Sequence, residues 1–286
     1  MIKELNKYKN FIFAAHDYGA GKQIIHLANQ VEGKKHFLFQ GPSKVLIKHE
    51  TELSQIELKN SVNSKLENCF IIGTGWQTDF ELFVMDFAHK NQVDFYVVID
   101  HWYNIKDRFK SKKFLVNPTN IIVFDEFIKE MCAKYLPKST IIKLDNYLLN
   151  DLKNELDIIQ NRKKNSLLFI DEPFRNNEKI IYDKLLSNIN LLASRFNCDR
   201  IIFREHPSGA TNLAIKSFLS TNINKFEFTF SNSSLSDDLK ISKVILGNSS
   251  YALFLADKLG FPCFSLSILI SGEKKFPDNC NIEYLT

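Results

Sequence analysis

The segments RIIFREHPSG (200–209) and VILGNSSYALFLA (244–256) decide the fold, because each runs from an apolar strand through a polar turn into a helical pattern. In a parallel α/β sheet such turns lie at the carboxyl ends of the strands, where ligands bind. The first turn offers an arginine and a histidine, and the second offers two serine hydroxyls. The stretch from Arg200 to Leu266 therefore predicts a ligand site built on a parallel sheet.

Short apolar strands alternate with amphipathic stretches along the whole chain, which predicts βαβ units. Helices are expected at 22–31, about 79–89 and 178–196, and the polar residues 145–165 are expected to form a helical linker. We therefore predict an α/β protein with two Rossmann-like, doubly wound domains at 1–150 and 166–286. The expected strands are 11–15, 36–40, 69–73, 95–100, 120–124, 140–144, 167–170, 201–203, 226–230, 244–246 and one after Pro262.

The composition is that of an ordinary soluble globular protein, with 44% hydrophobic and 24% charged residues. A net charge of +4 does not indicate nucleic-acid binding, but it suits an anionic small ligand or loose contact with an anionic membrane. Five scattered cysteines favour a reduced protein in the cytoplasm, and a location at the inner membrane surface stays open. No signal peptide or membrane span is expected. The histidines show no metal-ligand spacing, so no metal or bound cofactor is expected. The oligomeric state stays open.

The second polar turn is the first candidate binding site. Backbone N–H groups at a helix N-terminus, together with two hydroxyls, suit a phosphate. The alternative is that Asn248 or Ser249 only caps the following helix. The residues assigned to the phosphate here are Gly247, Asn248, Ser249 and Ser250.

The turn with the histidine is the second candidate. His206 could donate to a phosphate or to a leaving-group oxygen, because its pKa lies near working pH, and Pro207 would fix the turn that aims it. Arg204 could neutralise phosphate oxygens, and Ser208 adds a hydroxyl. The alternative is a strand-end histidine that merely caps the next helix.

The first turn of the chain, His16 to Gly21, is the third candidate. Its glycines would let the backbone approach a substrate, and Asp17 would deprotonate an acceptor hydroxyl. The turn matches neither the dinucleotide fingerprint nor a P-loop. We expect His16, Tyr18 and Gly19 to contact substrate, unless Asp17 only caps the helix.

The end of the fourth strand brings Asp100, His101 and Trp102 together, closely followed by Arg108. Aromatic rings stack on sugar faces and carboxylates accept from sugar hydroxyls, so these residues suit a sugar, although Trp102 could equally be packing. Asp100 and Asp17 are equal candidates for the general base.

Two weaker candidates remain. Glu172 follows the first strand of the second domain and could bind a ribose or an acceptor, or it could sit in a solvated turn. Trp76 follows the third strand of the chain and is a candidate for contact with the acceptor.

With His206-Pro207 and Ser249-Ser250 in these places, the second domain resembles bacterial GT-B glycosyltransferases of surface-polysaccharide synthesis, the enzymes of capsule and lipopolysaccharide. The sialyltransferase, polysialyltransferase and Kdo-transferase groups are the most similar. The resemblance implies two facing Rossmann-like domains with the ligand in the cleft between them. It also implies an inverting, metal-independent transfer of a sialic, nonulosonic or Kdo-type acid sugar from a CMP donor, used as co-substrate, to a glycan hydroxyl. His206 would stabilise the departing CMP phosphate.

Other functions stay open. Residues 99–102 also resemble the GT-B-fold UDP-sugar hydrolase of pseudaminic acid synthesis, although the turn at 16–22 departs from that enzyme's pattern. A UDP-sugar hydrolase or epimerase is therefore one alternative. Teichoic-acid glycerophosphate transferases carry similar motifs, so a phosphotransferase using a CDP-glycerol-type donor is another. A non-catalytic partner in glycan assembly is the last.

Overall fold

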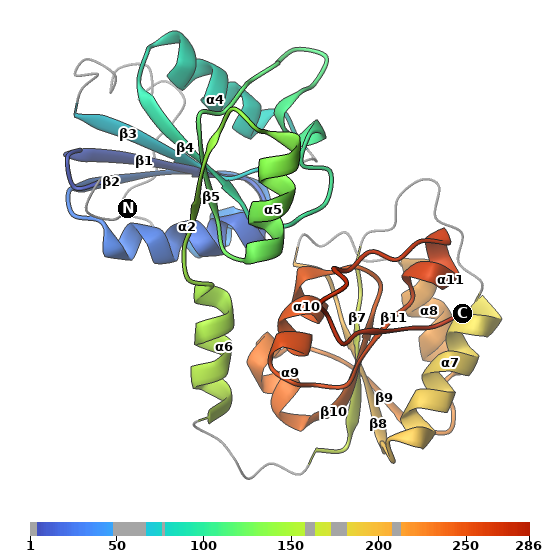
Figure 1. Ribbon diagram of the computed structural model, residues 1–286. Helices are drawn as coiled ribbons and strands as arrows, with labels where there is room; N and C mark the ends of the chain where they lie inside the picture. Colours follow the sequence, from blue (N-terminus) through green and yellow to red (C-terminus); the bar gives the residue numbers. More distant parts are fainter. Residues whose placement is uncertain (1–4, 48–66, 76–77, 158–163, 173–181, 208–212) are drawn as a thin grey trace. The chain divides into compact units, whose positions relative to one another are not determined.

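The chain folds into two compact units, Met1–Leu148 and Leu149–Thr286, seen in a computed structural model (Figure 1). Described are residues 5–47, 67–75, 78–157, 164–172, 182–207 and 213–286. The division between the units falls within helix α6 (Tyr147–Asp157), inside the stretch for which the sequence predicts a helical linker.

The first unit is built on six parallel strands, of which the four central ones are largely buried on both faces and the two edge strands are partly exposed. The strands are β1 (Asn10–Ala15), β2 (Lys34–Phe39), β3 (Asn68–Ile72), β4 (Asp94–Ile99), β5 (Asn120–Val123) and β6 (Thr140–Lys143). Their order in the sheet is β2-β1-β3-β4-β5-β6. The order reverses between β1 and β3, and in open α/β sheets ligands bind outside the carboxyl ends of strands at such a point.

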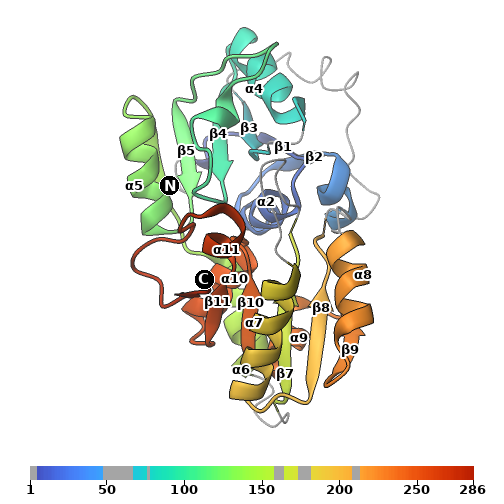
Figure 2. The same ribbon diagram turned by 90° about the vertical axis from the view of Figure 1, so that its right-hand side faces the viewer.

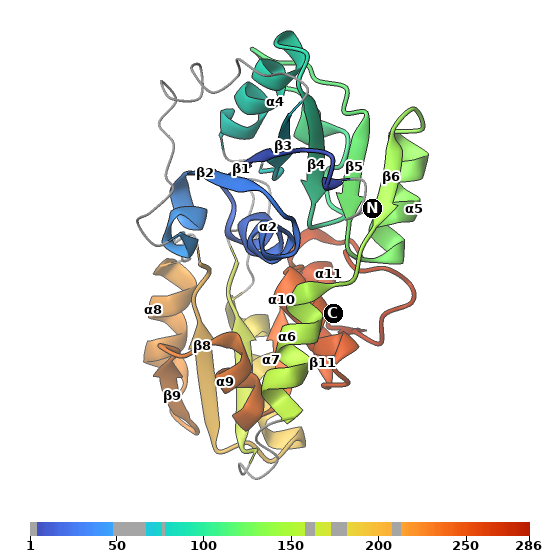
Figure 3. The same ribbon diagram turned by 90° about the vertical axis from the view of Figure 1, so that its left-hand side faces the viewer.

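Helices cover both faces of this sheet. Side chains of α2 (Tyr18–Gln30), such as Leu27, pack on alternate strand residues that include Phe13 and Ile71. The intervening residues face the other way, where the ring of Phe70 meets Phe87 of α4 (Phe80–Lys90). Figure 3 shows α2, α4 and α5 (Glu126–Tyr135) around the strands. Two short 3-10 turns, η1 (Gly41–Leu46) and η2 (Asp107–Phe109), follow β2 and β4.

The second unit has a six-stranded parallel sheet of its own. The strands are β7 (Ser166–Ile170), β8 (Arg200–Arg204), β9 (Glu227–Phe230), β10 (Ser242–Gly247), β11 (Cys263–Ser265) and β12 (Glu283–Tyr284). The order is β12-β11-β10-β7-β8-β9, and the reversal lies between β7 and β10. This is the order of a Rossmann sheet, with β7 as its first strand. The two-residue strand β12 is not among the strands predicted from the sequence.

The core of the second unit lies under α7 (Tyr182–Arg195) and α8 (Leu213–Asn222). Their apolar residues, for example Ile189 and Leu219, pack on Phe169, Phe203 and Leu246 of the strands. Figure 2 shows α7 and α8 on this face of the sheet, and Figure 3 shows α9 (Leu235–Ile241) and α10 (Tyr251–Lys258) on the opposite one. A last short helix, α11 (Ser267–Ser271), follows β11.

Both units are thus doubly wound parallel α/β domains, and the predicted fold class is confirmed. Within the described ranges no helix is both long and apolar enough to cross a bilayer. The five cysteines are free thiols, and Cys69, Cys132, Cys198 and Cys263 are buried, as the core interpretation predicts.

Candidate functional site

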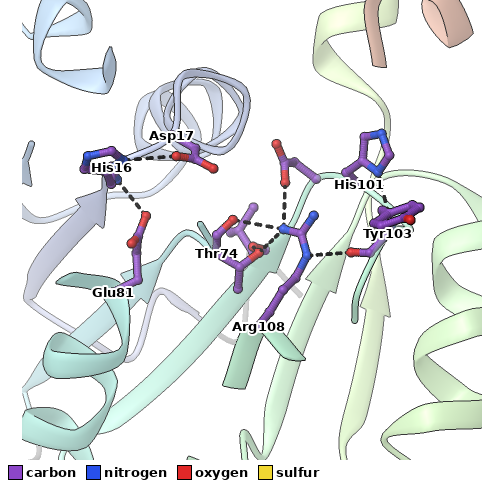
Figure 4. Close-up of polar contacts among 9 residues, drawn as sticks. His16, Asp17, Thr74, Glu81, His101, Tyr103 and Arg108 are labelled. Atoms are coloured by element: carbon purple, nitrogen blue, oxygen red, sulfur yellow. Dashed lines mark hydrogen bonds and ion pairs between the residues drawn. The ribbon is translucent and has the colours of Figure 1, made fainter. Parts of the chain in front are cut away.

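The turn after β1 places two ionisable side chains beside a buried glutamate of α4. His16 Nδ1 lies 3.0 Å from Asp17 Oδ1, and the His16 backbone N–H donates to Glu81 Oε1 at 2.8 Å (Figure 4). The side chains of His16 and Asp17 are 12% and 23% exposed, whereas Glu81 is 2% exposed. Asp17 is therefore the member of this group that a ligand reaches most readily.

The predicted glycine turn from His16 to Gly21 is shorter than expected, because α2 already begins at Tyr18. Gly19 and Gly21 lie in its first turn and allow close packing of the helix. A Cβ built on Gly19 would lie 2.6 Å from Asp100 Oδ2, and one built on Gly21 would lie 2.8 Å from Ser43 Cβ. Gly19 thus brings the start of α2 against Asp100.

Two further glycines fit closely around the same side chains. A Cβ on Gly75 would lie 3.1 Å from Glu81 Oε1 and 3.2 Å from Asp17 Oδ1, so both carboxyls cover the same backbone position. Gly41 has φ +53°, a left-handed conformation, and a Cβ there would lie 2.3 Å from His16 Nε2. The imidazole therefore packs on the backbone at Gly41 while its Nδ1 faces Asp17.

Glu81 is a buried carboxyl whose pKa is raised well above its ordinary value. Burial raises the pKa of Glu81 to about 7, and the nearby Asp17 carboxylate adds to the rise; the hydrogen bond from the His16 N–H acts in the opposite direction. A carboxyl that titrates near neutral pH beside a more exposed carboxylate is the arrangement that separates acid and base roles in active sites.

Arg108 organises the ends of β3 and β4. It is 8% exposed, and its Nη1 donates to Thr74 O at 2.9 Å, to Thr74 Oγ1 at 2.8 Å and to Asp100 Oδ1 at 3.3 Å. Its Nε donates to Tyr103 O at 3.0 Å (Figure 4). Burial raises the pKa of Asp100, Arg108 counteracts the rise, and the charge of Asp17 adds to it. Asp100 is thus held in place by Arg108, and its pKa depends on the charge of Asp17.

The aromatic residues after β4 are partly used in packing. Trp102 is 5% exposed, its ring stacks on His101 with 4.2 Å between centroids, and its edge meets Phe127. His101 Nδ1 accepts the Tyr103 backbone N–H at 3.1 Å, which leaves Nε2 as the protonated nitrogen of a neutral ring. This placement favours packing for Trp102 over stacking on a sugar, with His101 above it as the more exposed ring.

The structure brings together His16, Asp17, Gly19 and Asp100 at the carboxyl ends of β1, β3 and β4, and it adds two residues to which the sequence analysis gave no role. These are Glu81 and Thr74. Glu81 shares one helical stripe with Val84, Met85 and Ala88, all buried, so a charged residue at a core position was the available signal. Trp76 lies outside the described residues. Among the described residues no group of three or more His, Cys, Asp or Glu side chains could hold a metal ion.

In the second unit the turns after β7 and β10 are joined directly. Glu172 Oε1 accepts the Ser249 backbone N–H at 2.6 Å and the Ser249 hydroxyl at 3.2 Å. Ser250 is the N-cap of α10, and its Oγ accepts the Leu253 N–H at 3.2 Å. A carboxylate of the protein therefore lies where the sequence predicts a phosphate, and the capping role falls to Ser250 rather than to Asn248 or Ser249.

The neighbouring residues of this turn are mostly buried. Asn248 is 4% exposed, and its carbonyl accepts the Ser265 hydroxyl at 2.6 Å. Gly247 is the last residue of β10 and is buried. Ser249, Ser250 and Glu172 are half-buried, so they are the residues of this turn that a ligand could contact.

Strand β8 supplies the histidine turn. His206 and Pro207 follow β8, which pairs with β7, so they lie at the same carboxyl edge as Glu172 and Ser249; His206 is half-buried and Pro207 exposed. Arg204 instead points to α9, where its Nη1 donates to Asp238 Oδ2 at 2.7 Å and to Ser233 O at 2.8 Å. Asp238 is 3% exposed, so Arg204 is the cation that compensates a buried carboxylate. Ser208 lies outside the described residues.

Two Rossmann-like units in one chain define the GT-B fold. The chain is similar to the MnaA protein of S. aureus determined with UDP, at 12% identity and TM-score 0.65 over 90% of this chain and 79% of that one. It is also similar to UDP-GlcNAc 2-epimerase from Neisseria meningitidis bound to UDP-GlcNAc (15%, TM-score 0.60, 90% and 82%) and to the wall teichoic acid polymerase TagF (13%, TM-score 0.57, 99% and 76%). At these identities the similarity establishes the fold. No family model and no curated protein matches the sequence.

Proposed function

We propose that the chain is an enzyme that acts on nucleotide-activated sugars. The observation that carries the proposal is the group of carboxyls at the point of strand reversal in the first unit. There the half-buried Asp17 lies beside Glu81, whose pKa is raised to about 7, and near Asp100, whose pKa is also raised. Carboxyls whose pKa is raised in this way are typical of sites that transfer protons during catalysis.

The second unit supports the nucleotide part of the proposal. Its strand order and the turn before α10 suit a phosphate near Ser249 and Ser250, with His206 on the adjacent strand end. Phosphate binding would require the Ser249 N–H and hydroxyl to exchange the Glu172 carboxylate for a phosphate oxygen. His206 would then offset charge on the same phosphate.

The leading form of the reaction is inverting transfer of an acid sugar from a CMP donor to a glycan hydroxyl, as the His-Pro and Ser-Ser motifs imply. Asp17 takes the proton of the acceptor hydroxyl, the acceptor oxygen bonds to the anomeric carbon, and the bond to the CMP oxygen breaks. The electron pair of that bond leaves with CMP, whose charge His206 offsets. A positioned donor of this kind contributes about 2.7–4 kcal/mol to lowering the barrier.

A second candidate function is epimerisation or hydrolysis of a UDP-sugar. It is favoured by the neighbouring carboxyls Asp17 and Asp100, because the raised pKa of Asp100 would let it act as the acid while Asp17 acts as the base. Two similar structures were determined with UDP or UDP-GlcNAc. A third candidate, transfer from a CDP-linked alcohol, is favoured by the motifs that resemble those of teichoic-acid transferases and by the similarity to TagF.

One incubation series tests the proposal. The full chain is mixed with CMP-, CDP- and UDP-linked sugars, with and without glycan acceptors, and the nucleotides and sugars are analysed. CMP release that needs an acceptor supports the transferase; a changed sugar or UDP release without acceptor supports the second candidate.

The controls use two carboxylates. Asp17→Asn should lower turnover about 10²–10⁴-fold, whereas Asp183→Asn, at an exposed carboxylate on α7, should leave it unchanged. No turnover with any donor, together with no shift of the melting temperature by CMP, CDP, UDP or GDP, would contradict the proposed function.

A further inference from the structure

Glu81 is buried too deeply to contact a ligand, yet it lies against the residue assigned as the base. It is 2% exposed and belongs to the apolar stripe of α4. One of its oxygens, Oε1, accepts the His16 backbone N–H at 2.8 Å. The other, Oε2, is buried and has no hydrogen-bond partner among the described residues. A buried ionised carboxylate with an unpaired oxygen is far more costly than a neutral acid in the same place.

The charged groups that act on Glu81 come from the turn after β1. They are Asp17, whose negative charge opposes ionisation of Glu81, and His16, whose ring and N–H favour it. Glu81 and Asp17 both lie over Gly75, so a second negative charge on Glu81 would face the first at short range. Repulsion and burial therefore act together against the doubly charged pair.

We propose that Glu81 is a positioning residue for Asp17: as a neutral acid it anchors the turn after β1 through the His16 N–H and leaves Asp17 as the one charge of the pair. When Glu81 loses its proton, the charge is relieved by opening of this turn toward water. Asp17 then leaves its position, and the site is switched off above neutral pH. This catalytic consequence rests on the proposed function, whereas the protonation of Glu81 does not.

The protonation is tested without any substrate. The full chain is labelled with 13C at the glutamate side-chain carboxyl and titrated by NMR between pH 5 and 9, and the Glu81 signal is assigned by its loss in Glu81→Gln. We expect this signal to titrate near pH 7. A signal that titrates in the ordinary glutamate range overturns the proposal, whatever the chain catalyses.

The positioning role is tested with two substitutions at the same site. Glu81→Gln keeps an acceptor for the His16 N–H but cannot ionise, whereas Glu81→Leu loses the acceptor. With the donor identified in the incubation series, wild-type kcat should fall about tenfold per pH unit above the Glu81 transition, and Glu81→Gln should abolish that fall. Glu81→Leu, which cannot ionise either, should have a kcat about tenfold below that of Glu81→Gln at every pH, because one buried hydrogen bond is lost.

A matched control is Glu130→Gln, an exposed glutamate on α5, which should keep the wild-type pH profile. Identical pH profiles of wild type and Glu81→Gln would overturn the positioning role even if Glu81 titrates near pH 7. Absence of any turnover would instead overturn the proposed function, while the NMR titration would still decide the protonation of Glu81.

Discussion

The two units place different chemistry at the same point of similar sheets. In the first unit the strand ends at the reversal carry Asp17 and Asp100, and Glu81 of α4 lies beside Asp17. The charge of Asp17 adds to the rise in pKa that burial causes at Glu81 and Asp100. In the second unit the equivalent strand ends carry Ser249, whose N–H and hydroxyl bind the Glu172 carboxylate, and Ser250, which caps α10. The first arrangement suits moving protons and the second suits holding an anion, so we expect substitutions in the two units to fail in different ways.

The largest expected effect is on turnover in the first unit. Asp17→Asn removes the most exposed carboxylate of the group without changing its size, so kcat should fall about 10²–10⁴-fold, the usual contribution of a general base. Steady-state kinetics on the identified donor would measure this. A higher KM with unchanged kcat would assign Asp17 to substrate binding and would remove the difference between the units.

The next effect concerns stability in the second unit. Arg204→Met leaves the buried Asp238 without its cation, and breaking a buried pair in this way costs about 3 kcal/mol or more of unfolding free energy. Urea unfolding of the variant measures the cost, and Arg195→Met, an exposed arginine on α7, is the control. Unchanged stability with weaker nucleotide binding would show that Arg204 serves the phosphate instead.

A pH effect on stability should belong to the first unit. The pKa of Glu81 is raised from 4.5 to about 7 by folding, so its contribution to stability is fully present below pH 4.5 and is lost as the pH rises through 7. The loss amounts to at most about 3 kcal/mol, and Glu81→Gln should remove it. Unfolding free energies at pH 5 and pH 8 provide the measurement. Equal pH dependence in the variant and the wild type would contradict the burial argument.

The smallest effect should come from Glu172. If its carboxylate competes with a phosphate for the Ser249 donors, Glu172→Gln weakens the competitor and should raise nucleotide affinity a few-fold, roughly 1 kcal/mol or less. Calorimetric titration with the preferred nucleotide tests this. A clear loss of affinity would mean that Glu172 contacts the ribose or the acceptor, as the sequence analysis suggested.

The sequence predicts the strands and the linker well because buried parallel strands are nearly continuous apolar runs that end in polar turns. It also points to Asp17, Asp100, His206 and Ser249, since strand ends and helix starts are visible as patterns. What it could not show are contacts across the sheet. Glu81 of α4 accepts a hydrogen bond from the His16 backbone N–H. Glu172 binds the Ser249 N–H just before α10, where the sequence predicts a phosphate. The ion pair between Arg204 and Asp238 likewise depends on three-dimensional packing, which the sequence pattern does not show.

The most direct test of the division of roles is nucleotide affinity, measured by calorimetry on Asp17→Asn and Ser249→Ala side by side, with Ser187→Ala as the exposed control. The account predicts wild-type affinity for Asp17→Asn and about tenfold weaker binding for Ser249→Ala, the cost of one charge-assisted hydrogen bond. Weaker binding by Asp17→Asn with unchanged binding by Ser249→Ala would contradict it.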